Sequence, residues 1–278
     1  MTRPARPTLR SARPDDLAGL GPLYEQSGFG ARLAGVVGFA RARLDGEVVV
    51  AEAGGELVGV AAGAVFTGTG WVGGVAVVPG HRRAGLGGAL TEAIVEFLEG
   101  RGVTTVLLHA TALGRPVYER LGFVPEAAYL TLIGPTRPPS AGDPSLRAGR
   151  QSDLKAVLAL DLAATGEDRR RLLTALWPTG GLVATDGRPV GYHLASPWRS
   201  GGAVVAADPG AGLALLDAVR ATPGEEVAIS VPAANTPALR SLEVAGFSEH
   251  SRTIRMHRGP RVPWNPTALF GAHNLFWG

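Results

Sequence analysis

The sequence predicts an α/β protein of the mixed α+β type, built from two tandem domains that each carry a central, mostly antiparallel sheet flanked by helices. Three observations lead to this prediction. The chain has 278 residues, more than one typical domain needs. Landmarks of its first half recur in the same order in its second half. A stretch rich in proline and glycine, residues 134–144, separates the halves.

Four pairs of segments carry the repeat: 9–17 with 146–154, 55–59 with 187–191, 77–79 with 207–209, and 121–123 with 245–247. Each copy opens on a short strand that runs into a helix, where Pro14 or the pair Ser152 and Asp153 gives the start signal. Each copy then reads as two helices, three antiparallel strands, helix, strand, helix and strand. We expect domains at 1–138 and 139–258, followed by an apolar segment, 259–278, that docks on the protein.

The run VAVVPGHRRAGLGG at residues 75–88 is an apolar strand that feeds a basic, glycine-rich turn. Leucine or isoleucine recurs at every fourth residue from Leu86 to Leu98, which predicts an amphipathic helix that ends near Arg101. The first turn of a helix has N–H groups without partners and a partial positive charge. The glycines let a phosphate approach them, and Arg82 and Arg83 add full charges. The pattern predicts a pyrophosphate site.

The pattern Arg82-x-x-Gly85-x-Gly87 after a V-x-V-V-P strand resembles the acetyl-CoA loop of the Gcn5-related N-acetyltransferase (GNAT) superfamily. Residues 107–125 resemble the other signature of that family, a strand, a loop, a short helix with Tyr118, and then Leu-Gly-Phe. The two signatures have the order and separation of the family and together span residues 75–125. The resemblance implies a GNAT fold in each copy and acetyl-CoA as cosubstrate.

The resemblance also assigns roles. Residues implied to bind the cofactor are Val75, Ala76 and Val77 on the fourth strand, then Arg82, Arg83, Ala84, Gly85, Leu86, Gly87 and Gly88, and finally Thr111. The strand backbone would pair with pantetheine and polarise the thioester carbonyl. Tyr118 would protonate the departing thiolate as general acid, although a tyrosine there can also simply pack. Gly73 and Gly74 suit the bulge that a splayed fourth strand requires.

The sequence does not identify the residue that acts as general base. The family usually supplies a carboxylate on the fourth strand, but residues 71–78 contain none. Four groups are candidates: Glu52, Glu25, His109 and the carboxylate of Gly278. Glu167 and Asp168 could attract an ammonium group, but their place beside Gly166 favours a role in capping a helix within residues 161–176.

The second copy lacks this chemistry. No Arg-Arg-x-Gly-x-Gly follows Pro209, and Leu242 stands where the first copy has Tyr118. Asn235 has the same offset from Leu242 as Thr111 has from Tyr118, which indicates descent of the repeat rather than a second active site. We expect the second copy to shape the substrate cleft or to close a homodimer.

Composition limits the alternatives. The chain has no cysteine, which excludes disulfides, thiolate metal sites and a cysteine acyl-enzyme. No apolar run reaches the roughly 18 residues of a membrane helix and the first residues do not resemble a signal peptide, so we expect a cytoplasmic protein without a membrane partner. The net charge is only +3 and no arginine cluster alternates with aromatic residues, so we expect no nucleic-acid partner.

Together these features predict an N-acetyltransferase that moves an acetyl group from acetyl-CoA to a primary amine by direct attack in a ternary complex, without a metal. The acceptor would be a small-molecule or peptide amine. A non-catalytic acyl-CoA-binding or sensor protein is the alternative, favoured by the missing acid on the fourth strand.

Overall fold

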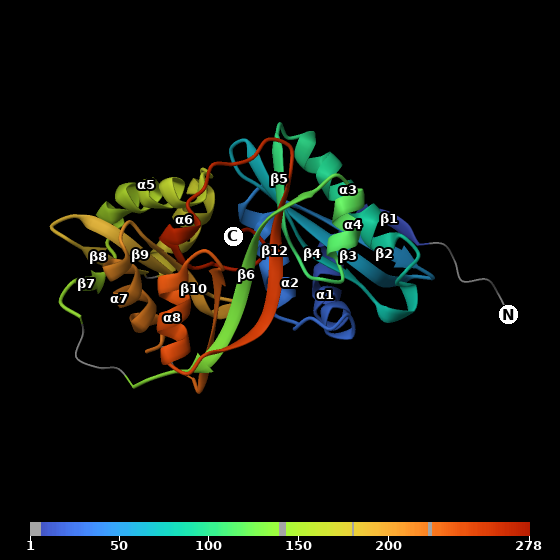
Figure 1. Cartoon of the computed structure of the whole chain (residues 1–278). Coiled ribbons are helices and arrows are strands. Elements are labelled where there is room, and N and C mark those ends of the chain that lie inside the picture. The colour runs from blue at the N-terminus through green and yellow to red at the C-terminus, as the bar shows by residue number, and fades with distance from the viewer. Residues whose placement is uncertain (1–6, 139–142, 180, 222–223) are drawn as a thin grey trace.

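The computed structural model describes residues 7–138, 143–179, 181–221 and 224–278, so part of the predicted linker, 139–142, lies outside them (Figure 1). The first copy contains β1 (Thr8–Ser11), α1 (Pro14–Gln26), α2 (Leu33–Arg43), β2 (Glu47–Ala53), β3 (Glu56–Val65), β4 (Thr69–Val77), α3 (Leu86–Glu99), β5 (Thr105–Ala110), α4 (Arg115–Arg120) and β6 (Val124–Pro135). The second contains β7 (Leu146–Ala148), α5 (Leu154–Thr165), α6 (Arg170–Leu176), β8 (Gly181–Thr185), β9 (Pro189–Ser196), β10 (Arg199–Ala206), α7 (Pro209–Val219), β11 (Glu226–Pro232), α8 (Thr236–Val244) and β12 (Ser248–Arg258). Both copies have the predicted element order, and the predicted fold class is confirmed.

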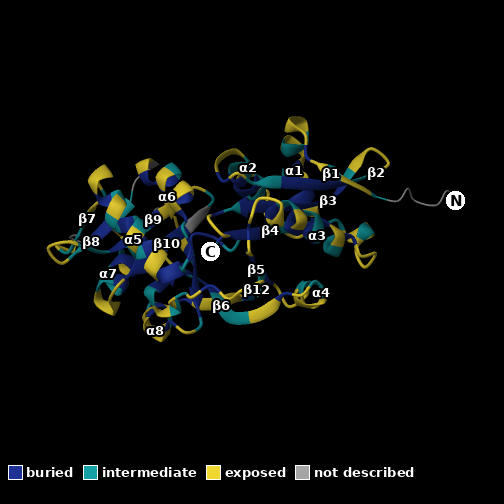
Figure 2. Ribbon diagram, turned by 90° about the horizontal axis from the view of Figure 1, so that it is seen from above, coloured by how far each residue is buried: buried dark blue, intermediate teal, exposed yellow. Residues whose placement is uncertain are grey.

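Local sequence accounts for the helices that carry the site. Pro14 begins α1, and the Asp16 carboxylate accepts a hydrogen bond from the Arg13 N–H at its first turn. Along α3 the predicted apolar stripe is buried against the sheet, from Leu86 to Leu98. Figure 2 shows the result from above, with buried strands between helices whose outer surfaces are exposed.

The sheets do not follow the division of the chain into two halves. One sheet has the order β1-β2-β3-β4-β5-β12-β6-β11, and the other has the order β13-β10-β9-β8-β7, where β13 is Leu269–Gly271. Strand β12 of the second copy therefore lies between β5 and β6 of the first, and β11 pairs with β6. The domain limits 1–138, 139–258 and 259–278 stay a prediction, but main-chain hydrogen bonds cross both of them. The eight-stranded sheet therefore contains two strands of the second copy, whereas the five-stranded sheet contains strands of residues 146–271 alone.

A continuous apolar core also joins the two copies. Val36, Ala40 and Trp71 of the first copy belong to the same buried cluster as Leu172 and Tyr192 of the second. Burial of apolar area of this kind stabilises contacts at roughly 25 cal/mol per Å². The two copies therefore pack as one body, and the label C in Figure 1 marks the end of the chain between them.

The final segment occupies the gap between β10 and β11. Strand β13 pairs antiparallel with β10, and the Ala272 N–H then donates to the Ser230 carbonyl of β11 over 2.8 Å. The buried Asn235 side chain donates to the carbonyls of Thr267 and Leu269 over 3.1 and 2.9 Å. Phe270 packs so close to α7 that a Cβ on Gly212 would lie 2.3 Å from its ring. This segment closes the second copy with the protein's own backbone.

Candidate active site

The site begins where two parallel strands separate. Strand β4 pairs with β5 only from Thr69 to Trp71, and beyond that point β4 keeps β3 as its partner while its other edge has none in the sheet. The pairing of β3 with β4 shifts register between Val60 and Ala62, where two residues of β4 stand opposite one. The predicted bulge is therefore confirmed, and it leaves main-chain N–H and C=O groups of β4 available to a ligand.

Gly74 makes this bulge possible. Its φ is +63°, and a Cβ there would lie 2.5 Å from the Tyr24 hydroxyl oxygen. The buried Tyr24 hydroxyl donates to the Gly74 carbonyl over 3.0 Å and holds the bulge from the side of α1. Tyr24 has no sequence signal that separates it from an ordinary core tyrosine.

A cavity of about 1320 Å³ opens at this separation of strands. Its lining includes ten of the eleven residues predicted to bind the cofactor, and the predicted general acid: Val75, Ala76, Val77, Arg82, Arg83, Gly85, Leu86, Gly87, Gly88, Thr111 and Tyr118. Ala84 is the predicted residue that does not line it. The structure thus brings the two sequence signatures, residues 75–88 and residues 107–125, together in one cavity.

The start of α3 is open at one end of this cavity. No side chain caps the helix, and Gly85 adopts a φ of +81° at the N-cap. A Cβ on Gly87 would have only Val77 Cγ2, at 4.0 Å, as a near neighbour. Free N–H groups with open space before them can receive an anion.

The two predicted arginines have different surroundings. Arg82 donates to the Val77 carbonyl and to the Ser27 carbonyl, each over 2.8 Å, and so ties the end of β4 to the end of α1. Arg83 is exposed, with a φ of +64°. Arg120 of α4, which the sequence argument did not select, also lines the cavity. The hollow is therefore positively charged at its phosphate end.

The matching region of the second copy is closed to anions. The Asp208 carboxylate caps α7 by accepting from the Ala211 N–H over 2.9 Å, so a negative charge already occupies the helix start. Strand β13 lies in the gap between β10 and β11. The asymmetry expected from the missing loop thus has a physical basis in the tertiary structure.

Two titratable side chains line the cavity beyond the loop. Tyr118 on α4 is partly buried, and this burial raises the pKa of its phenol to about 12. His109 lies on β5 beyond the residues that pair with β4 and opposite Arg255 of β12, and burial together with the charge of Arg255 lowers the pKa of its imidazole to about 3. The His109 ring stacks on Trp71, with Nδ1 3.5 Å from the Thr253 hydroxyl, while Nε2 has no protein partner among the described residues. The phenol is protonated at neutral pH and the imidazole is neutral.

Of the four candidate bases, His109 alone lines the cavity. Glu52 forms an ion pair of 2.7 Å with Arg10 on the far strands, and Glu25 is exposed on α1. The Gly278 oxygen accepts from Arg169 over 2.8 Å and borders a separate, small cavity between the copies. Among the described residues that line the large cavity there is no aspartate or glutamate.

The second copy and the final segment supply one end of the cavity. The lining residues that sequence analysis did not select there are Trp198, Ser251, Thr253, Asn274, Leu275 and Phe276. The Phe276 ring packs against the bulged strand β4, where a Cβ on Gly73 would come 2.5 Å from this ring. The apolar character of residues 259–278 indicates docking but not the place of docking, so no sequence signal identifies these residues individually.

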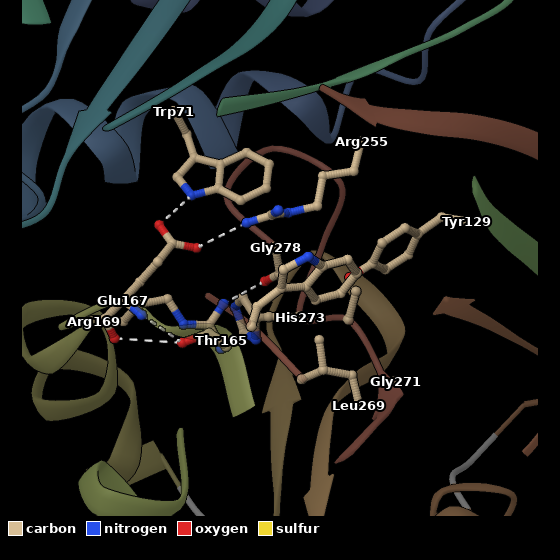
Figure 3. Close-up of a pocket in the computed structure, with 12 residues that line it drawn as sticks. Trp71, Tyr129, Thr165, Glu167, Arg169, Arg255, Leu269, Gly271, His273 and Gly278 are labelled. Carbon is tan, nitrogen blue, oxygen red and sulfur yellow. Dashed lines mark hydrogen bonds and ion pairs between the residues drawn. The ribbon is translucent and has the colours of Figure 1, made fainter. Parts of the chain in front are cut away.

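A buried polar cluster lies beside this end, between the copies (Figure 3). One carboxylate oxygen of Glu167 accepts from the Thr69 hydroxyl over 2.9 Å and from Trp71 Nε1 over 2.8 Å, and Arg255 Nη2 lies 3.9 Å from the other oxygen. The expectation that Glu167 caps a helix is wrong. Helix α5 ends at Thr165, and the φ of +72° at the following Gly166 turns the chain so that Glu167 contacts Thr69 and Trp71 of β4.

Its neighbour Asp168 does cap a helix, as the sequence predicts. The Asp168 carboxylate accepts from the Arg170 N–H over 3.1 Å at the start of α6. Arg169 makes two hydrogen bonds to Asp161, over 2.6 and 3.0 Å, and donates to the carbonyls of Trp277 and Gly278 over 3.2 and 2.8 Å. This fully buried pair anchors the final segment beside the cavity.

We expect the stability of the protein to fall between about pH 5 and pH 7 through Glu167. Burial raises the pKa of its carboxyl to about 7 from 4.5, so the folded state binds this proton more tightly than the unfolded state does. The free energy of unfolding then decreases as pH rises through this range, by on the order of 3 kcal/mol. Chemical unfolding of wild type and Glu167→Gln from pH 5 to 8 measures it: the variant should gain relative to wild type as pH rises. A pH-independent difference would contradict the prediction.

Two family models match this chain. A model for the acetyltransferase (GNAT) domain matches residues 44–125, and a second model with the same description matches residues 157–271. Together they cover more than half of the chain. The chain belongs to the GNAT superfamily. Because each copy matches a model of the same domain, it is a tandem member.

Solved structures share the fold along nearly the whole GNAT chain. A candidate acetyltransferase from Pyrococcus horikoshii is 22% identical with a TM-score of 0.84, over 98% of this chain and 96% of that one. A GCN5-related N-acetyltransferase from Sphaerobacter thermophilus is 23% identical with a TM-score of 0.68, over 96% and 100%. A tandem GNAT protein of the clavulanic acid biosynthesis pathway is 16% identical with a TM-score of 0.63, over 92% and 99%. No curated protein sequence matches the chain significantly.

Two features are absent from the described residues. None of their helices is long and apolar enough to cross a membrane. No group of three or more histidines, aspartates or glutamates in this part of the chain could hold a metal ion.

Proposed function

We propose that this GNAT protein transfers the acetyl group of acetyl-CoA to a primary amine by direct attack in a ternary complex. The main support for this proposal is the large cavity. The open start of α3, the free edge of β4 and Tyr118 all line it. The residues fit the cosubstrate because a Cβ at Gly87 would occupy open space in front of the helix start. Without cysteine in the sequence, a thiolate acyl-enzyme is excluded.

Each part of the cavity would have one task. Acetyl-CoA supplies an activated acetyl thioester. The N–H groups at the start of α3 and the arginine side chains would hold its phosphates, and Val75 to Val77 would pair with pantetheine and polarise the carbonyl. The Tyr118 phenol, whose raised pKa keeps it protonated, would stabilise the departing thiolate by donating its proton or a hydrogen bond.

The proton of the amine would leave through His109. This imidazole is neutral, and its Nε2 has no partner among the described residues. In the tautomer whose Nδ1–H donates to the Thr253 hydroxyl, Nε2 would accept a hydrogen bond from an attacking amine. Its lowered pKa makes it a weak base, which suits an amine that arrives without a positive charge. Glu25 and Glu52 do not line the cavity, so the proposal gives neither of them this task.

A non-catalytic acyl-CoA sensor is the second candidate. One observation favours it: no carboxylate is present among the described residues that line the cavity, whereas proton removal from an ammonium calls for a competent base. A sensor would bind acetyl-CoA without turnover.

The test is an assay of the full chain with acetyl-CoA and a panel of primary amines, read by release of CoA thiol and by the mass of the product. We expect amine-dependent thiol release with an N-acetylated product. Tight acetyl-CoA binding by calorimetry without turnover on any amine would instead support the sensor.

A further inference from the structure

The second copy and the final segment form one end of the cavity, and the proposed transfer gives this end no task. Asn274, Phe276 and Trp198 all line the cavity. Asn274 is only 5% exposed, and its Nδ2 has no partner among the described residues. A buried polar group without a partner costs free energy, so this one points to a ligand.

The orientation of the Asn274 amide is determined by the backbone. Its Oδ1 accepts from the N–H groups of Phe276 and Trp277 over 2.8 and 3.2 Å. Because a rotated amide would place NH₂ against two N–H donors, the oxygen must stay on that side. The unpartnered Nδ2 of Asn274, a residue that lines the cavity, is therefore a hydrogen-bond donor, and a donor cannot receive an ammonium group.

The described lining of the cavity offers no negative charge to an ammonium group. Its charged side chains are those of Arg32, Arg82, Arg83 and Arg120, and the last three belong to the phosphate end. His109 is neutral, and the remaining polar groups at this end are the hydroxyls of Ser251 and Thr253. Moving an ammonium from water into a hollow without an opposite charge is costly.

The walls at this end are apolar and include two aromatic rings. Leu33 and Val36 of α2 face the cavity together with Trp198 and Phe276. Trp198 is held in place edge-on by Phe39, with ring centroids 5.0 Å apart, and by Trp277 at 6.0 Å. Such walls bury apolar and aromatic area and offer little to a long polar chain.

We propose that the acceptor is an amine that is uncharged at neutral pH and sits on a flat apolar body, the class of the aromatic amines, with Asn274 Nδ2 donating to a polar group of that body. This inference rests on the proposed acetyl transfer. It also removes the need for a strong base, because an uncharged amine attacks without first losing a proton. The proton released after attack can pass to the neutral His109.

The test compares aniline with benzylamine, which carry the same ring but differ in charge at pH 7.5. With acetyl-CoA and the full chain, we expect aniline to have a kcat/KM at least tenfold higher. Preference for benzylamine or for the polyamine spermidine would overturn the inference while leaving acetyl transfer standing. Acetyl-CoA binding without acetylation of any amine would instead overturn the proposed transfer itself.

The variant Asn274→Asp tests the role of Asn274 in the choice between aniline and benzylamine. The carboxylate keeps one oxygen for the N–H groups of Phe276 and Trp277 and places a negative charge where Nδ2 lies in the wild type. We expect the ratio of kcat/KM for aniline over benzylamine to fall at least tenfold. Asn265→Asp is the matched control, because Asn265 Oδ1 also accepts from a main-chain N–H, that of Thr267, but on the exposed surface. In Asn265→Asp, the ratio of kcat/KM for aniline over benzylamine should equal that of wild type.

Trp198→Leu provides a second, independent variant that removes the aromatic wall without adding charge. We expect KM for aniline to rise at least fivefold with little change in kcat, and acetyl-CoA binding by calorimetry to stay intact. An unchanged ratio in Asn274→Asp with wild-type acetyl-CoA affinity would overturn the role of Asn274. If Asn274→Asp fails to bind acetyl-CoA, an unchanged KM in Trp198→Leu overturns the aromatic acceptor.

Discussion

Gly87→Leu is expected to abolish acetyl-CoA binding, with a loss of affinity of at least ~100-fold. The leucine side chain would fill the open space before α3, where a Cβ meets no atom closer than 4.0 Å, and would keep phosphate oxygens from the helix N–H groups. Loss of two charge-assisted hydrogen bonds of about 1.5–3 kcal/mol each accounts for that magnitude. Because the space is empty of protein atoms, folding should be unaffected. Calorimetry with acetyl-CoA and a thermal unfolding curve measure both quantities.

The matched control is Gly210→Leu at the start of α7 in the second copy. Asp208 already caps that helix and β13 closes the gap beside it, so this change should leave acetyl-CoA affinity as in wild type. The same titration should give one acetyl-CoA per chain. A stoichiometry near two, or equal losses in both variants, would show that the two helix starts bind alike.

Tyr118→Phe is expected to lower kcat by something like 10²-fold and to leave acetyl-CoA affinity nearly unchanged. The ring keeps its edge-on contact with Phe123, at a centroid distance of 6.1 Å, so only the proton donor is lost. Burial raises the pKa of the phenol to about 12, which keeps the donor protonated throughout the working range of pH. Steady-state kinetics with an amine that wild type acetylates measure the effect.

Tyr129→Phe makes the same chemical change outside the large cavity and should keep a kcat close to that of wild type. A Tyr118→Phe enzyme with unchanged kcat, in an assay limited by chemistry, would mean that the phenol packs and does not donate. An equal loss in both variants would point to a general effect on the fold around β5 and β6.

The sequence by itself determined the element order and one end of the site. Periodicity, proline and glycine signals are local, so the strand, turn and helix from Val75 to Leu98 could be predicted, together with the open helix start at Gly85. The same locality explains the prediction of the bulge at Gly74, where a glycine pair interrupts a strand. Features within one element depend on residues that are neighbours in the chain.

Only the tertiary structure decided how the two copies exchange strands and what completes the cavity. Strand β12 joins the first sheet through its hydrogen bonds to β5, over a separation of more than a hundred residues. The sequence predicts that Glu167 caps a helix, but the turn after α5 places its carboxylate against Trp71. Asn274 acquires its role from Phe276 and the cavity wall together. These functions arise from packing between segments far apart in the chain, and apolar packing is non-directional, so no local pattern encodes where a segment will dock.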